Sequence, residues 1–179
     1  MVQKLLILIF SVVLLAACGN APTKEVSNNS ETISVYENAS ALTHNMEGVK
    51  LKIDYEVKKI TGKVEKLNKN SLTPGDFLLE VTGEIRNDFE RTIYYTPTFI
   101  VQSDSQVQFE EIASSVEVEQ LELEPTTKET FTITYVIPKE SYGQFSSLNF
   151  VVPAAFSEPN SVSSGDALGD STTWEIPIK

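Results

Sequence analysis

The sequence predicts an all-β protein built as an antiparallel β-sandwich. Runs in which apolar and polar residues alternate recur along the chain, turn-forming residues separate them, and no stretch shows a long helical period. Alternation with a period of two places the apolar side chains on one face of a strand. Several short runs of this kind with turn signals between them are typical of a sandwich, so we expect about seven strands between residues 49 and 179.

Residues 1–17 have the features of a signal peptide. Lys4 supplies a positive charge, and an apolar core of about 13 residues follows, which is short of the ~20 that a membrane-spanning helix needs. We therefore exclude this segment from the fold.

The segment Leu15-Ala16-Ala17-Cys18 contains the one cysteine of the chain and resembles the bacterial lipobox. The resemblance implies cleavage between Ala17 and Cys18 and a diacylglyceryl group on the Cys18 thiol. A protein held by two or more acyl chains stays firmly on the membrane. We therefore expect a lipid-anchored protein on the extracytoplasmic face of the cell membrane. A thiol that simply follows an apolar run is the alternative.

Residues 18–48 are interpreted as the lipidated cysteine and a flexible stalk, and residues 49–179 as the sandwich domain. The stretch from Gly19 to Ser34 is polar and lacks periodicity, as is typical of a linker. Residues 35–48 are ambiguous, since their apolar side chains suit either the edge of a core or a short helix.

The first predicted strand is Val49–Val57, where apolar and charged residues alternate without a break. Phe77–Asn87 repeats the pattern, with Gly83 at an apolar position where a neighbour is expected to approach closely. The remaining strands are expected at residues 93–101, 116–123, 131–137, 148–152 and 174–178. The predicted core includes Leu51, Ile53, Tyr55, Leu79, Val81, Phe131, Ile133, Tyr135, Phe150 and Trp174.

Several of these segments resemble a known family. Phe77–Asn87, then Leu123-Glu124-Pro125, the run "FTITYVIP" and Leu148-x-Phe150 are similar to the telokin-like, immunoglobulin-fold domain of Gram-positive lipoproteins of unknown function. The resemblance covers residues 49–152 and implies an immunoglobulin-like sandwich. It implies no catalytic residues.

Composition limits the possible partners. The chain has 25 acidic and 14 basic residues and a formal net charge of −11. Such a charge repels nucleic acids, so we expect no nucleic-acid partner. With Cys18 acylated no cysteine is left for a disulfide, and packing alone must stabilise the domain.

Residues able to perform catalysis are scarce, so we expect no enzyme and no cofactor. His44 is the one histidine and falls in the ambiguous stretch at the end of the stalk, before the first predicted strand, so we expect a solvated side chain. No histidine and cysteine cluster suits zinc, and no glycine-rich phosphate loop is present.

Carboxylates and aromatic residues give weaker candidates. Glu117, Glu119, Glu122 and Glu124 are expected on the wet faces of a strand, and Asp166 and Asp170 are weak calcium candidates in a glycine-containing loop. Tyr94 and Tyr95 are adjacent, so one must face outward, and together with Phe99 they form a possible contact patch.

The leading functional hypothesis is a non-catalytic module that binds a protein or cell-wall partner at the cell surface. The alternatives are a cell-envelope hydrolase that uses paired carboxylates and, with less support, the substrate-capturing lipoprotein of an importer. A single domain offers no hinged pair of lobes for that last role.

Overall fold

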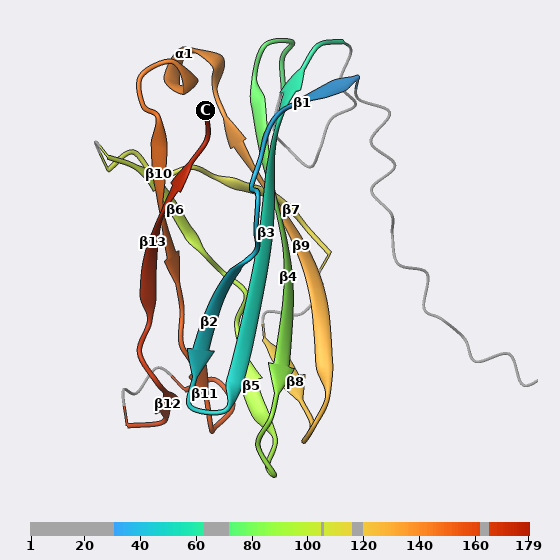
Figure 1. The fold of residues 1–179 in the computed structure, drawn as a ribbon, viewed down its shortest axis with the longest axis vertical. Coiled ribbons are helices and arrows are strands. Elements are labelled where there is room, and N and C mark those ends of the chain that lie inside the picture. Colours follow the sequence, from blue (N-terminus) through green and yellow to red (C-terminus); the bar gives the residue numbers. More distant parts are fainter. Residues whose placement is uncertain (1–30, 63–71, 105, 116–119, 162–164) are drawn as a thin grey trace, which may run out of the picture.

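A computed structural model describes residues 31–62, 72–104, 106–115, 120–161 and 165–179, and within these ranges the protein is an all-β sandwich (Figure 1). The predicted signal peptide, its cleavage site and Cys18 lie outside the described residues. No helix in these ranges is long and apolar enough to cross a membrane. The elements are β1 (Thr32–Glu37), β2 (Leu42–Met46), β3 (Val49–Ile60), β4 (Phe77–Asn87), β5 (Ile93–Tyr95), β6 (Ile100–Ser103), β7 (Glu111–Ser114), β8 (Leu121–Leu123), β9 (Lys128–Ile137), α1 (Lys139–Tyr142), β10 (Ser147–Val152), β11 (Ala155–Phe156), β12 (Ala167–Leu168) and β13 (Thr172–Pro177).

One layer of the sandwich is a six-stranded antiparallel sheet. Its strands follow the order β1-β3-β4-β9-β7, and β2 pairs with a second part of β3. The long strands β3, β4 and β9 alternate buried and exposed side chains, as their sequences predict. The alternation leaves one face of this sheet apolar and the other polar.

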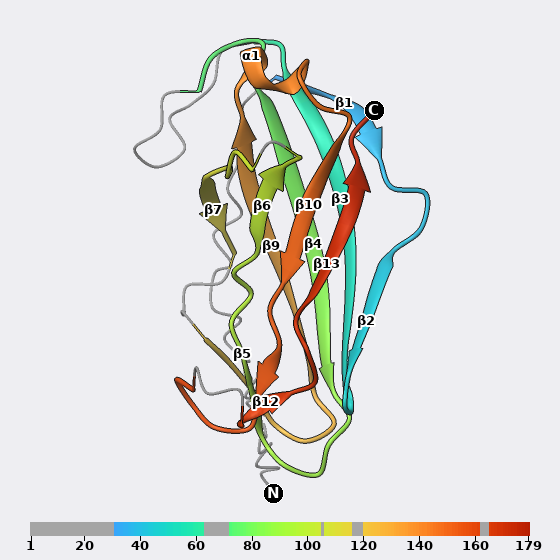
Figure 2. The same ribbon diagram turned by 90° about the vertical axis from the view of Figure 1, so that its left-hand side faces the viewer.

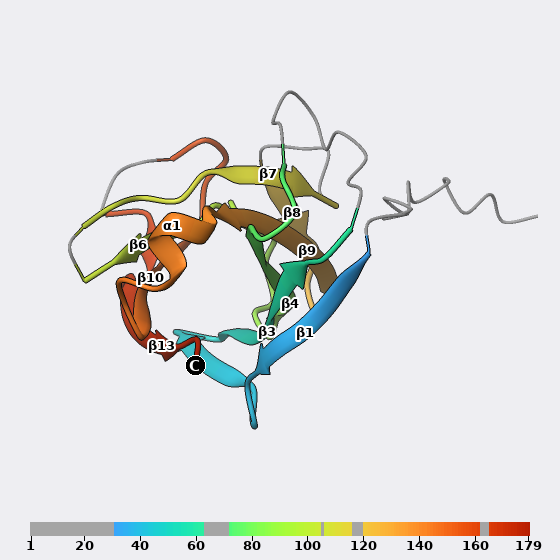
Figure 3. The ribbon, with the colours of Figure 1, turned by 90° about the horizontal axis from the view of Figure 1, so that it is seen from above.

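The facing layer consists of two smaller antiparallel sheets. One has the order β13-β10-β6 and the other the order β12-β11-β5-β8. Seen from above, β6, β10 and β13 lie across the interior from β3, β4 and β9 (Figure 3). The predicted fold class, an antiparallel β-sandwich, is confirmed.

The core lies between the layers and contains most of the predicted residues. Of the ten residues predicted to lie there, nine are buried, and Trp174 is partly buried against the others. Gly83 lies directly opposite Phe131 on β9, and the Phe131 ring occupies the space that a side chain at Gly83 would need. The close approach predicted at Gly83 is therefore confirmed.

The predicted boundary between stalk and domain at residue 49 is wrong, because the sheet already contains β1 and β2. Thr32–Glu37 and Leu42–Met46 both pair with β3. Glu47 and Gly48, with φ angles of 41° and 94°, form the two-residue turn of a β2–β3 hairpin. Both strands lie at the edge of the sheet, where many side chains face solvent, so their apolar pattern is weak.

The strands are also more numerous than the seven predicted. The run predicted at residues 93–101 divides at Pro97 into β5 and β6, which belong to different sheets. Proline cannot donate to a sheet ladder, which explains the break. Of the strand predicted at 116–123, Leu121–Leu123 forms β8, and residues 116–119 lie outside the described ranges. The two-residue strands β11 and β12 were not predicted.

The two ends of the sandwich differ. The start of β1 lies at the end that carries α1 and the C-terminus (Figures 1 and 2), and the amide of Thr61 at the end of β3 donates to the carbonyl of Glu31 at 2.8 Å. At the opposite end, the buried Asn87 side chain donates to the carbonyls of Arg91, Leu123 and Glu124. Asn87 thereby ties the β4–β5 and β8–β9 turns together.

Candidate functional site

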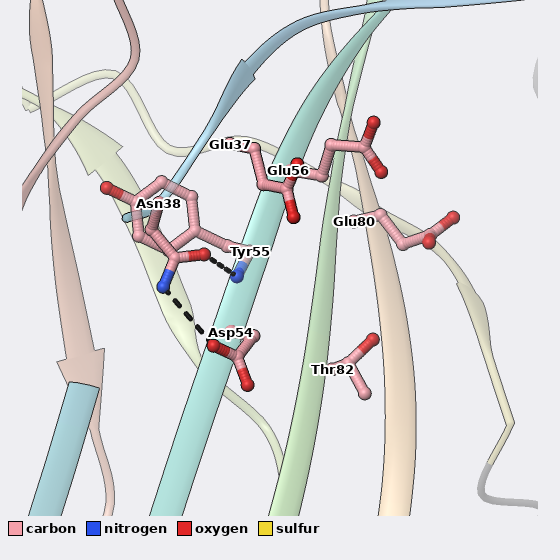
Figure 4. A pocket seen from close by; sticks show the side chains of 7 residues that line it. All are labelled: Glu37, Asn38, Asp54, Tyr55, Glu56, Glu80 and Thr82. Atoms are coloured by element: carbon pink, nitrogen blue, oxygen red, sulfur yellow. Dashed lines mark hydrogen bonds between the residues drawn. The ribbon is translucent and has the colours of Figure 1, made fainter. Parts of the chain in front are cut away.

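An acidic hollow of about 150 Å³ lies on the outer face of the six-stranded sheet (Figure 4). Glu37 of β1 lies opposite Glu56 of β3, and Glu56 lies opposite Glu80 of β4. Three carboxylates therefore form one row across three strands. The hollow is lined by Glu37, Asn38, Asp54, Tyr55, Glu56, Glu80 and Thr82.

Lys58 neutralises part of this row. Its Nζ lies 3.2 Å from Glu56 Oε2 and 3.1 Å from Glu80 Oε1, and all three side chains are about one quarter exposed. Burial alone lowers the pKa of Lys58, but the hydrogen bonds and charges of Glu80 and Glu56 outweigh this and raise it. Like charges directly opposite each other destabilise a sheet, so this ammonium group offsets the repulsion in the row.

Asn38 fixes the other wall of the hollow. Its Oδ1 accepts a hydrogen bond from the Tyr55 amide at 2.7 Å, and its Nδ2 donates to the Ser40 carbonyl at 2.8 Å and more weakly to Asp54 Oδ1 at 3.5 Å. Residues 38–41 connect β1 to β2. The sequence analysis missed this hollow, because the register that aligns β1, β3 and β4 cannot be read from one strand.

A second hollow lies beside α1 and is lined by Asp76, Val136, Pro138 and Lys139 among others. Asp76 is buried and accepts hydrogen bonds from the Thr73 amide, the Thr73 hydroxyl and the Lys139 amide. These bonds use both oxygens of the Asp76 carboxylate, so Asp76 connects the start of β4 to α1.

His44 lies on β2 and is not part of a stalk. Its Nε2–H donates to the Asp170 carbonyl at 2.9 Å, and its ring meets the edge of Trp174 at 6.3 Å. The contacts join β2 to the segment before β13, across the open side of the sandwich. The solvated stalk histidine of the sequence analysis is therefore corrected to a partly buried residue that links the two layers.

The calcium candidates do not come together. Asp166 accepts a hydrogen bond from the Ser161 hydroxyl at 2.7 Å, and Asp170 meets His44 through its backbone carbonyl. No group of three or more potential metal-binding side chains occurs among the residues that the structure describes. Glu117 and Glu119 lie outside those residues, whereas Glu122 and Glu124 are exposed as predicted.

The aromatic candidates separate. Tyr95 and Phe99 are buried in the core, whereas Tyr94 is partly exposed on the outer face of the four-stranded sheet. Tyr94 lies opposite Glu122 of β8 on one side and opposite Phe156 of β11 on the other. Phe156 extends the patch, and sequence reasoning missed it because it follows Tyr94 by 62 positions in the chain.

Comparison with known proteins places the chain in a family and supports its fold. A family model described as "Domain of unknown function (DUF5068)" matches residues 21–179. None of the curated proteins matches the sequence.

Three solved structures are similar to the chain. The yjhA protein of Bacillus subtilis has 15% sequence identity and a TM-score of 0.52, over 77% of this chain and 97% of that one. A conserved hypothetical protein of Bacillus anthracis has 16% identity and a TM-score of 0.49, over 82% and 99% of the two chains. A chain described as "putative lipoprotein (ycdA)" of Bacillus subtilis has 12% identity and a TM-score of 0.49, over 77% and 39%. The first of these likenesses supports the fold alone.

Proposed function

The chain belongs to the DUF5068 family, and from this premise we propose that it is a membrane-anchored, extracytoplasmic lipoprotein that acts as a non-catalytic binding module with an immunoglobulin-like fold. The observation that carries the proposal is the lipobox-like segment Leu15–Cys18 after a short apolar run. The region matched by the family begins at Ala21, after two intervening residues. Anchoring signal and family domain are therefore adjacent in the chain and do not overlap.

The arrangement of the strands suits attachment at one end of the sandwich. The start of β1 lies at the α1 end, and the 12 residues between Cys18 and Glu31 can span at most about 45 Å. An anchor at Cys18 would keep the α1 end close to the bilayer. The opposite end, with the turns tied by Asn87 and the four-stranded sheet, would then face outward.

A binding role fits the surfaces better than the hydrolase alternative does. A hydrolase of this kind needs one carboxyl group in its protonated form as a general acid. The facing carboxylates of Glu56 and Glu80 are both engaged in ion pairs with the ammonium group of Lys58. The importer alternative requires two lobes around a substrate, whereas the described strands form one sandwich with one main core.

The anchoring part of the proposal is tested by replacing Cys18. We expect Cys18→Ser to abolish both incorporation of a labelled fatty acid and removal of the first 17 residues, since the acylated thiol is the processing substrate. Metabolic labelling and the mass of the purified protein measure the two events, with Asn20→Ala as the control. A Cys18→Ser protein that is still processed at residue 18 would contradict the proposal.

The non-catalytic part is tested by complementing a deletion strain at matched expression. We expect the double variant Glu56→Gln/Glu80→Gln and the single variant His44→Ala to retain the cellular phenotype, and Cys18→Ser to lose it. If the glutamine variant folds but loses the phenotype, the hydrolase becomes the better explanation.

A further inference from the structure

The outer face of the four-stranded sheet carries two partly exposed aromatic residues side by side. Glu122, Tyr94 and Phe156 are successive cross-strand neighbours on β8, β5 and β11. Directly opposite residues in a sheet share one face. The flanking residues Ile93 and Tyr95 are buried, which shows that Tyr94 points away from the core. We call this surface the Tyr94 face and add the exposed Glu124 and Glu158, whose charges act on Tyr94.

The carboxylates of the Tyr94 face, those of Glu122, Glu124 and Glu158, form no ion pairs among the residues that the structure describes. On the six-stranded sheet the carboxylates of Glu56, Glu80 and Glu84 do form such pairs. Partial burial raises the pKa of Tyr94, and the charges of Glu122, Glu158 and Glu124 raise it further. Glu122 lies directly opposite Tyr94 in the sheet, so its carboxylate is close enough to act on a group that contacts the ring.

Residues on both sides of Glu158 form hydrogen bonds. The Ser157 amide donates to the Asp166 carbonyl at 2.9 Å, and the Asn160 amide donates to Gln120 Oε1 at 2.9 Å. The second bond reaches the residue directly before β8, the strand that carries Glu122. A surface held in this way loses little conformational entropy when it binds a partner.

We propose that the Tyr94 face is the docking surface for a lysine- and arginine-containing peptide segment of a partner protein. Glu122, Glu124 and Glu158 would pair with its cations, and the rings of Tyr94 and Phe156 would receive its aliphatic stems and cationic groups. A second copy of this chain does not suit the surface, since each copy carries a net charge of −11 and would repel the other.

This inference rests on the proposed function, because an anchor before β1 leaves this face accessible. β5, β11 and β12 lie at the end of the sandwich opposite α1 and the start of β1 (Figures 1 and 2). A partner could therefore reach the face without displacing the membrane.

The test is a titration of the full-length protein, in detergent, with a fluorescein-labelled dodecapeptide of alternating lysine, arginine and serine, measured by fluorescence anisotropy. We expect Glu122→Gln/Glu158→Gln to weaken binding about tenfold or more, since two unshielded charge contacts are lost. Glu129→Gln/Glu140→Gln removes the same charge from exposed positions elsewhere and should change the affinity less than twofold. Tyr94→Leu should weaken binding several-fold, whereas Tyr94→Phe should retain it.

Two results would overturn the proposal. Equal losses of peptide affinity in the two glutamine double variants would show that the net charge of the protein attracts the peptide and that no local surface binds it. The absence of peptide binding by the wild-type protein, or binding of a neutral glycan in its place, would refute the partner chemistry. Either failure leaves the Cys18 processing result unchanged, so it can be distinguished from failure of the anchoring proposal. Unaltered circular dichroism would show that each variant is folded.

Discussion

Two buried tyrosines of the core differ in whether their hydroxyl groups have hydrogen-bond partners. Tyr95 and Tyr135 are both buried tyrosines in the same core. The Tyr135 hydroxyl donates to the Phe99 carbonyl at 3.1 Å, whereas the Tyr95 hydroxyl has no hydrogen-bond partner among the described residues. A buried polar group without a partner costs about 1–3 kcal/mol. The two hydroxyl groups should therefore contribute to stability with opposite signs.

We expect Tyr95→Phe to raise the free energy of unfolding by up to ~1 kcal/mol, because it removes an unpaired hydroxyl and leaves the ring packing intact. Tyr135→Phe is the matched control and should lower it by about 1 kcal/mol through the lost hydrogen bond. Urea denaturation of both variants measures the difference. Destabilisation by Tyr95→Phe would show that this hydroxyl has a partner in solution.

Asp76 gives the fold an acid-sensitive contact. Burial alone raises its pKa, but the hydrogen bonds from Thr73 and Lys139 and the charge of Lys139 lower the pKa below the usual aspartate value. A carboxyl group whose pKa falls on folding stabilises the protein above its unfolded pKa. That stabilisation is lost as the pH falls through the folded pKa.

We expect Asp76→Asn to destabilise the protein at neutral pH and to remove part of its acid sensitivity. The difference in urea midpoint between wild type and variant should be constant from about pH 6 to 8 and shrink below about pH 4, the range of an unperturbed aspartate. Asp54→Asn, at an exposed position of β3, serves as the control. A difference that stays constant down to about pH 2, well below that range, would refute the assignment.

At the scale of elements, long strands were predictable and short or edge strands were not. β3, β4 and β9 have 10 to 12 residues each, and buried positions recur along one face for most of each strand, so the alternation is visible in the sequence. β1 has solvent on both sides for much of its length, with Ile33 and Val35 exposed, and β11 and β12 have only two residues each. A period-two pattern cannot be detected in a strand where so few positions are buried.

Gly83 is the element-scale position where sequence and structure agree most closely. We expect Gly83→Ala to destabilise the protein by about 1–3 kcal/mol, because the added methyl group must displace the Phe131 ring between β4 and β9. Gly143→Ala is the control, since its side chain would point into open space at an ordinary φ of −74°. Thermal unfolding of both variants measures the difference in stability. Equal stability of the Gly83→Ala and Gly143→Ala variants would contradict the prediction.

At the scale of the whole molecule, the candidate surfaces depend on register, which the sequence does not reveal. The row of Glu37, Glu56 and Glu80 and the row of Glu122, Tyr94 and Phe156 each draw on three strands. Sequence reasoning identified Tyr94 and Glu122 separately but could not place them together. The lipobox-like segment, by contrast, consists of consecutive residues, so it can be recognised from the sequence without a structure.

Anchor and fold together predict which end of the molecule faces outward. The start of β1 lies at the same end of the sandwich as α1, so a lipid on Cys18 should hold Gly143 near the bilayer and Glu90 far from it. Both positions are exposed, and Cys18 is the one native cysteine, so single cysteines can be introduced for labelling.

We expect Gly143→Cys and Glu90→Cys both to react with an impermeant maleimide fluorophore on intact protoplasts, because the proposed anchor would hold the domain on the extracytoplasmic face. Energy transfer to an acceptor dye in the membrane should be clearly stronger in the Gly143→Cys variant than in the Glu90→Cys variant. Transfer efficiency falls steeply with distance, and the stalk limits how far the α1 end can move away. The parent chain without either substitution controls for background labelling. Equal transfer from the two positions would mean that the domain lies flat or tumbles freely, and it would remove the orientation on which access to the Tyr94 face depends.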